Sequence, residues 1–180
     1  MEQRLTNLIE ALGSDDGLKR KRAWETLTLL GEPAVLRLRE LLSSGNKRIR
    51  WEAARGLAAM VDPGSVQAFV ELLGDEHSEV RWLAGSGLIS LGPRSLVPVL
   101  TSLIQHPDSL GHQRVARRVL RGLSADNDVL KEIVGPVIGT LDYPDPAVIA
   151  SKAAVALNDL EKTTGVHHRM DFAASPETRA

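Results

Sequence analysis

The sequence predicts an all-α protein, a right-handed α-solenoid of about five helix-turn-helix repeats over residues 1–160. Two apolar ladders with helical spacing recur about every 30 residues, which is the signature of a stacked repeat array. Short polar segments separate the ladders. Only 3% of the residues are aromatic, so the core must be aliphatic.

The first ladder predicts the first helix of each repeat, helix A. Its apolar positions are spaced by three and four residues, which places them on one helix face. In chain order the five copies begin at Leu5, Val35, Val66, Val97 and Val134 and continue through Leu8, Leu38, Phe69, Leu100 and Val137 to Leu12, Leu42, Leu73, Ile104 and Leu141.

The second ladder predicts the second helix, helix B, with apolar residues at every fourth position. Lys19 stands at its start in the first repeat, which suits a solvent-facing end. The other copies begin at Ile49, Val80, Val115 and Ile149 and continue through Ala53, Ala84, Val119 and Ala153 to Leu57, Leu88, Leu123 and Leu157. Gly56, Gly87 and Gly122 share a position inside helix B in this alignment, which predicts close approach between helices.

Polar segments predict the turns inside and between the repeats. Those inside are GSDD (13–16), SSGN (43–46), GDEHS (74–78), HPDS (106–109) and DYPDP (142–146). Those between repeats are GEP (31–33), VDPG (61–64) and LGPR (91–94), where Pro suits the first turn of the next helix. Residues 161–180 lose the periodicity and are expected to form a mobile tail.

An Arg-Trp pair repeats together with the apolar residues. Arg50-Trp51 and Arg81-Trp82 occupy the same position of two repeats. Since successive helical residues rotate by about 100°, both tryptophans fall almost opposite the apolar stripe of helix B. They either pack sideways between adjacent repeats or lie exposed in a groove.

The segments DEHSEVRWLAGSGLISLG and GNKRIRWEAARGLAAMV resemble the short form of the HEAT repeat family, also found in proteins related to phycobilin lyases. The resemblance covers about residues 3–160. It implies that Arg50 and Arg81 belong to a structural ladder with turn aspartates, for which Asp75 and Asp145 are in position. Ala116 and Ala150 replace the arginine in repeats four and five in this alignment, so an incomplete ladder is expected.

In a solenoid of helix pairs, helix B lines the concave side and its outward face is the expected binding surface. The residues predicted to bind there are Trp51, Arg55, Trp82, Arg117 and Arg121. We expect a protein partner, especially an acidic segment, because arginine forms charge-assisted bonds with carboxylates. Nucleic acid on the same groove is the alternative, and a tetrapyrrole-binding, lyase-like accessory protein is a further one.

No catalytic residue, metal site or cofactor is expected, so the sequence predicts a protein that is not an enzyme. Nucleotide-binding and hydrolase motifs are absent from the sequence. HEAT-like deoxyhypusine hydroxylases use repeated His-Glu pairs, whereas this chain has only Glu76-His77 in the reverse order. HEAT-like alkylpurine DNA glycosylases use a concave acid, and Glu52 is expected on the helix flank. The adjacent His167 and His168 are assigned to the tail.

The composition is that of a soluble chain with no strong electrostatic preference. The 180 residues carry a net charge of −1 and no cysteine, which excludes disulfides and thiol chemistry. We expect no membrane span and a cytoplasmic location. The oligomeric state and the identity of the partner stay open.

Overall fold

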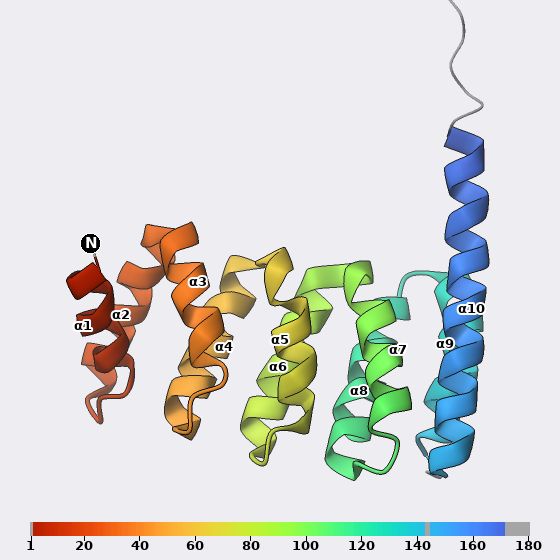
Figure 1. Cartoon of the computed structure of the whole chain (residues 1–180), viewed down its shortest axis with the longest axis horizontal. Helices are drawn as coiled ribbons and strands as arrows, with labels where there is room; N and C mark the ends of the chain where they lie inside the picture. The colour runs from red at the N-terminus through yellow and green to blue at the C-terminus, as the bar shows by residue number, and fades with distance from the viewer. Residues whose placement is uncertain (1, 143–144, 172–180) are drawn as a thin grey trace, which may run out of the picture.

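The computed structural model describes residues 2–142 and 145–171, which form ten α-helices, three short 3-10 helices and no strand (Figure 1). The α-helices are α1 (Glu2–Leu12), α2 (Gly17–Leu30), α3 (Glu32–Leu41), α4 (Lys47–Met60), α5 (Val66–Glu71), α6 (Ser78–Leu91), α7 (Leu96–Gln105), α8 (Leu110–Ser124), α9 (Asp128–Thr140) and α10 (Pro146–Asp171). The 3-10 helices are η1 (Pro63–Ser65), η2 (Leu72–Gly74) and η3 (Gly92–Ser95).

The helices form five successive hairpins that stack side by side, so the predicted solenoid is confirmed (Figure 1). Helices α2, α4, α6 and α8 pack against one another in chain order, and we call them the B row. Their partners α1, α3, α5 and α7 form the A row. Mostly aliphatic side chains fill the space between the rows, and the aromatic Phe69 is the largest fully buried side chain.

Polar turns cap three of the B-row helices, α2, α4 and α8, which explains where these helices begin. Asp16 Oδ1 accepts a hydrogen bond from the backbone N–H of Leu18 at 2.8 Å. Asn46 does the same for α4 and Ser109 for α8. Each cap satisfies a backbone donor that has no partner inside its own helix.

Three residues with positive φ occupy the same position at the ends of α2, α4 and α6. Gly31 has φ 66° and Gly92 has φ 73°, a region that glycine enters without strain. Val61 stands at the corresponding place with φ 49° and ψ 44°. A β-branched residue in the left-handed region is strained, so this turn stores energy that the other two do not.

Glycine inside helix B allows close helix contacts, as the sequence predicts. A Cβ added to Gly87 would lie 2.7 Å from the ring of Phe69, and one added to Gly56 would lie 3.1 Å from Leu38. Gly122 contacts Ile89 in the same way. These helices therefore approach more closely than alanine would permit.

The fourth repeat aligns differently from the sequence prediction. The buried residues of α8 include His112, Ala116 and Leu120, which correspond to Val80, Ala84 and Leu88. Val115 and Leu123, placed on the ladder by the sequence, are only partly buried. Helix α8 begins at Leu110, directly after the HPDS turn, so its core positions lie three residues earlier in the sequence than predicted, and Gly122 falls outside the glycine column.

The fifth hairpin stands in reverse order. Helix α9 packs against α8, and α10 packs against α7, so α10 lies at the end of the A row and α9 at the end of the B row (Figure 1). The expectation that the second helix of repeat five lines the binding face is therefore wrong. Helix α10 also continues to Asp171, eleven residues beyond the boundary at which the sequence predicts a tail. Residues 172–180 lie outside the described residues.

One stretch, Ser78–Gln105, is long and apolar enough to cross a membrane by length and composition. It comprises α6, η3 and α7, and half of its most apolar window is buried inside the protein. The core of a helical protein passes the same test, so this stretch is weak evidence for a membrane span.

Candidate functional site

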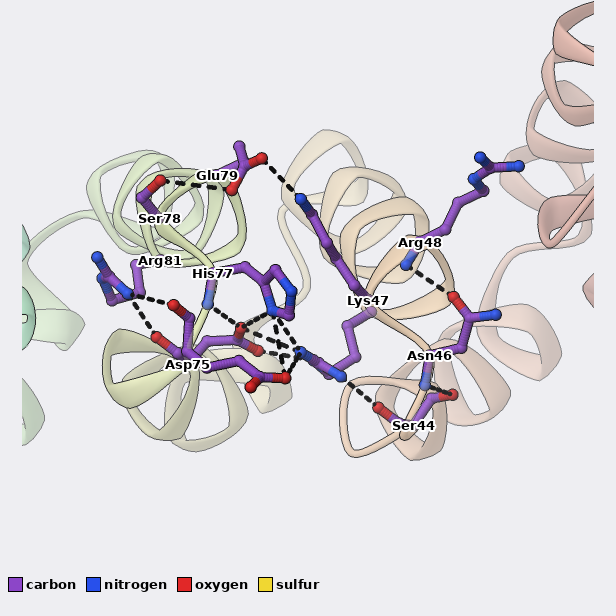
Figure 2. Close-up of polar contacts among 11 residues, drawn as sticks. Ser44, Asn46, Lys47, Arg48, Asp75, His77, Ser78, Glu79 and Arg81 are labelled. Carbon is purple, nitrogen blue, oxygen red and sulfur yellow. Dashed lines mark hydrogen bonds and ion pairs between the residues drawn. The ribbon is translucent and has the colours of Figure 1, made fainter. Parts of the chain in front are cut away.

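An ion pair joins the second repeat to the turn of the third. Arg50 Nε lies 2.6 Å from Asp75 Oδ2, and both side chains are buried. The backbone N–H of His77 donates to the same carboxylate at 2.8 Å (Figure 2). Burial would raise the pKa of Asp75, but the hydrogen bonds from Arg50 and His77 and the charge of Arg50 hold that pKa below its usual value. The hydrogen bond to Asp75 raises the pKa of Arg50 in turn.

Arg81 forms no ion pair with a carboxylate among the residues that the structure describes, but its hydrogen bonds explain why an arginine recurs at this position. Its Nη1 donates to the backbone oxygens of Asp75 at 2.7 Å and Glu76 at 3.0 Å (Figure 2). Arg20 and Arg50 reach the carbonyl six residues earlier in the same way, at Ser14 and Ser44. Each arginine thus fixes a turn to its own B-row helix, and in repeat four Gln113 donates to the Pro107 carbonyl instead.

The other predicted ladder residue, Asp145, has a local role. Its Oδ1 accepts from the backbone N–H groups of Ala147 at 2.9 Å and Val148 at 3.3 Å, so it caps α10. The pair that joins repeats four and five is formed by Arg117 and Asp142. The structure therefore places Arg117 in a link between repeats, whereas the sequence assigns it to the groove.

Trp82 lies on the outward face of the B row and is 56% exposed. The guanidinium of Arg118 lies 4.5 Å from the centroid of the indole. Arg118 also donates to the Trp82 carbonyl and to Ser86 Oγ, both at 2.9 Å. These bonds hold the guanidinium over the ring, so the exposed indole has a fixed cationic neighbour.

Two further cations follow on the same helix face. Arg114 and Arg121 are exposed, and neither has a hydrogen bond or ion pair within the described part of the chain. Leu110, one turn before Arg114, is 57% exposed. We call the set Trp82, Leu110, Arg114, Arg118 and Arg121 the Trp82 surface.

Trp51 lies differently from Trp82, because it is half-buried between the first two repeats. The guanidinium of Arg55 lies 5.3 Å from its ring centroid and 4.9 Å from that of Trp24. The next residue, Glu52, is only 3% exposed. Arg20 Nε lies 3.3 Å from Glu52 Oε1, and Arg55 Nε lies 3.4 Å from Glu52 Oε2. Glu52 thus lies on the side of α4 that faces α2, and its carboxylate is held between two arginines.

This cluster separates two depressions in the surface. One, of about 500 Å³, is lined by Gly17, Arg20, Lys21, Trp24, Glu25, Trp51, Glu52 and Arg55. The other, of about 740 Å³, shares Arg20, Trp51 and Glu52 and extends to Asp15, Lys47, Arg48 and Glu79. We call the first of them the Trp24 depression.

Sequence reasoning missed Arg118, Glu52 and Trp24 as site residues. Arg118 was missed because the misaligned fourth repeat places Arg117 and Arg121 in the groove columns. Glu52 and Trp24 lie at the sides of their helices, where contact between neighbouring repeats decides burial. An acid three residues before Arg55 was the signal that could have indicated the Glu52 ion pair.

No group of three histidine or acidic side chains that could hold a metal ion exists among the described residues. The side chains of His167 and His168 lie outside them. His77 contacts Arg50, Asp75 and Glu76 and belongs to the link between repeats.

Comparison with known proteins agrees with this architecture. Residues 5–89 match the sequence profile of HEAT repeats. A chain from the complex of CpcE and CpcF of phycocyanin lyase from Nostoc sp. PCC7120 has a similar structure, with a TM-score of 0.59 and 22% identity. The similarity covers 87% of this chain and 99% of that one. No curated protein sequence matches.

The similarity corrects the expectation that the chain is not an enzyme. A chain of a phycocyanin lyase shares this fold over almost its whole length. An absence of catalytic motifs in this fold therefore does not support the absence of an enzymatic role. Residues 5–89 match HEAT repeats, and the stacked helical hairpins continue the same solenoid architecture through the rest of the described chain.

Proposed function

We propose that the chain binds a protein partner through the Trp82 surface. The observation that carries the proposal is the exposure of Trp82, whose indole lies over Arg118. Tryptophan and arginine are the residues that most often dominate the energy of protein interfaces. A large apolar ring exposed beside fixed and free cations is typical of such a surface.

The partner segment is acidic. Arg114 and Arg121 have no carboxylate within the described residues to neutralise them, so a partner carboxylate would form charge-assisted hydrogen bonds there. The similar lyase chain comes from a complex of two different proteins, which supports assembly with a partner.

The test is affinity capture from the source cells with the wild-type chain, Trp82→Ala and Leu29→Ala. Leu29 is an exposed apolar residue on α2 and serves as the control. A protein retained by wild type and Leu29→Ala but lost with Trp82→Ala is then purified and titrated. We expect Trp82→Ala to cost about 2 kcal/mol of binding free energy. Equal retention by all three chains contradicts the proposal.

A lyase-related role is the second candidate. It is supported by the similarity to a phycocyanin lyase chain and by the indoles and arginines of the Trp24 depression, which suit a planar tetrapyrrole. A linear tetrapyrrole titrated into the wild-type protein would show a saturable absorbance change. Trp51→Ala would remove that change if the second candidate is correct.

Nucleic acid is the alternative occupant of the Trp82 surface. Bases would stack on the indole and phosphates would meet the arginines. Fluorescence anisotropy of a labelled oligonucleotide at two salt concentrations distinguishes it, because such binding weakens steeply with salt. An absence of binding at low salt excludes this alternative.

A further inference from the structure

A pocket of about 380 Å³ lies where the A row meets the turn of the fourth repeat. Its lining comes from α5, η2 and α7, from the turn that follows α7 and from the start of α8. The polar lining includes Gln67, Glu71, Ser102, Gln105 and His112. None of the lining residues belongs to the Trp82 surface. We call this cavity the His112 pocket.

His112 presents to this pocket an acceptor that has no partner. The side chain is only 2% exposed, and its Nε2 lies 2.9 Å from Ser102 Oγ. Because the serine donates its proton to the Val99 carbonyl, Nε2 carries the ring hydrogen and Nδ1 carries a lone pair. Nδ1 has no hydrogen-bond partner among the described residues and, unlike Trp24 Nε1, is not fully enclosed. Since His112 lines the pocket, Nδ1 is the atom that a bound donor can reach.

Glu71 adds a negative charge that nothing in the described part of the chain neutralises. Arg39 and Arg50 line an adjoining depression together with Glu71. Both are already paired, with Asp62 and Asp75. Among the described residues that line the His112 pocket, none is a lysine or an arginine. The pocket is therefore lined by hydrogen-bond acceptors and one carboxylate, with no permanent positive charge.

This lining restricts the charge and the hydrogen bonds of a ligand. An anion would lie beside the Glu71 carboxylate and would face the lone pair of His112 Nδ1. A cation without an N–H group would leave Nδ1 unpaired, which carries a desolvation cost. A protonated primary amine carries both the positive charge and three N–H donors. The volume of about 380 Å³ admits a small molecule or one inserted side chain.

We propose that the His112 pocket binds a primary ammonium group. One N–H donates to His112 Nδ1, and Glu71 neutralises the charge. The other N–H groups donate to the side-chain amide oxygens of Gln67 and Gln105. The site does not depend on partner binding at the Trp82 surface, so either proposal can fail without the other.

Three small probes with the same alkyl chain test the proposal. Butylammonium carries a charge and N–H donors, butyltrimethylammonium carries only the charge, and 1-butanol carries only a donor. The readout is the ring ¹⁵N signals of the full chain labelled at histidine, with His112 assigned by elimination through single substitutions of the other histidines. Titrations run in EDTA at pH 8, at which imidazoles are mostly uncharged and a primary amine keeps its proton. We expect butylammonium to shift the His112 Nδ1 signal saturably, with an affinity about tenfold above that of the other two probes.

Glu71→Gln removes the charge of the pocket and keeps the size of the side chain. Glu71 is exposed, so this variant leaves the core unchanged. We expect its affinity for butylammonium to fall about three- to fivefold, as for a solvent-exposed ion pair. Glu32→Gln is the matched control, because Glu32 is an exposed acid on α3 that does not line the pocket. It should keep the wild-type affinity.

Two results would overturn the proposal. One is a His112 Nδ1 signal that does not respond to butylammonium. The other is binding of butyltrimethylammonium or 1-butanol as tight as that of butylammonium, since neither offers the charge together with N–H donors. An equal loss of affinity in Glu71→Gln and Glu32→Gln would contradict the role of Glu71.

Two further probes identify the source of the amine. Putrescine is a free small amine, and Nα-acetyl-lysine methylamide presents the lysine side chain of a protein segment. Tighter binding of putrescine assigns the pocket to a small molecule, and tighter binding of the lysine probe assigns it to a partner protein. Binding of neither contradicts the proposal.

Discussion

His112 and Ser102 form a buried hydrogen bond in the fourth repeat, with His112 Nε2 2.9 Å from Ser102 Oγ. The single hydroxyl proton of Ser102 goes to the Val99 carbonyl at 2.7 Å. Nε2 of His112 must therefore carry the hydrogen and donate it to the serine. His112 is 2% exposed and occupies the core position that Val80 fills in the third repeat.

This arrangement makes the stability of the fold depend on pH. Burial lowers the pKa of His112 from 6.5 to about 4, with a smaller contribution from His106. The folded chain thus binds the proton less readily than the unfolded chain. The stability from neutral His112 is fully present above pH 6.5 and declines as the pH falls toward 4. We expect a loss of about 3 kcal/mol over this range, measured by urea unfolding at several pH values.

The control for this prediction is His112→Val, which copies the residue of the third repeat. The variant should unfold with a smaller pH dependence between pH 6.5 and 4, while Ser102 keeps its bond to Val99. Parallel curves for the two chains would show that His112 does not titrate as described.

Asp75→Asn should destabilise the protein by about 3 kcal/mol, because the buried Arg50 charge would lose its partner. Glu79→Gln removes a carboxylate from the exposed pair with Lys47 and should destabilise the protein much less, because solvent screens that pair. Urea unfolding at pH 7 compares the free energies of unfolding of the two variants. Equal losses of stability in Asp75→Asn and Glu79→Gln would contradict the stronger contribution of the buried ion pair.

The pKa of Asp75 lies below its usual value in the folded chain. Its contribution to the stability of the fold is therefore present above the pKa of the unfolded state and is lost as the pH falls through the pKa of the folded state.

Gly87→Ala should destabilise the protein by about 2 kcal/mol, because the new methyl group would lie against the ring of Phe69. Phe69 is fully buried and has no room to move aside. Gly139→Ala is the matched substitution, since nothing lies within 4 Å of the added atom in α9. It should stabilise the fold by about 0.5–1 kcal/mol through helix propensity. Thermal unfolding of both chains gives the comparison, and a stabilising Gly87→Ala would refute the contact.

Val61→Gly should stabilise the fold by up to about 1 kcal/mol, because glycine adopts the positive φ at the end of α4 without strain. Val61 is 47% exposed, so little packing is lost. Val129→Gly removes an equally exposed valine from α9 and should instead cost about 0.5–1 kcal/mol. Changes of the same sign in the two variants would argue against strain at Val61.

The repeat architecture was predictable because the two apolar ladders recur with one spacing. The fourth repeat was not, since a polar residue, His112, fills the core position and the apolar Val115 stands nearby. The sequence also does not indicate the reversed order of the fifth hairpin, because α9 and α10 both carry apolar faces that fit against either row.

The candidate site was predictable in part. The positions of Trp82 and Arg55 on the outward side of helix B follow from the helical rotation alone. For Trp51 the sequence allowed either packing between repeats or exposure in a groove. Its half-buried position depends on contact with α2, which is far away in sequence. Arg117 and Arg118 are neighbours, so a shift of three residues decided which of them lies beside Trp82 and which pairs with Asp142.

The ion pairs between repeats are unevenly distributed, and this has a consequence for the elasticity of the array. Pairs such as Arg20–Glu52, Arg50–Asp75 and Arg117–Asp142 join the first, second and fourth repeats to the repeats that follow them. Among the described residues, the third and fourth repeats meet without an ion pair, through contacts such as Val115 against Gly85. Salt screens exposed charges more strongly than buried ones and leaves apolar contacts in place. Strong electrolyte therefore loosens the joint held by the partly exposed Arg117–Asp142 pair, whereas the joint with the buried Arg50–Asp75 pair and the apolar joint between the third and fourth repeats keep their stiffness.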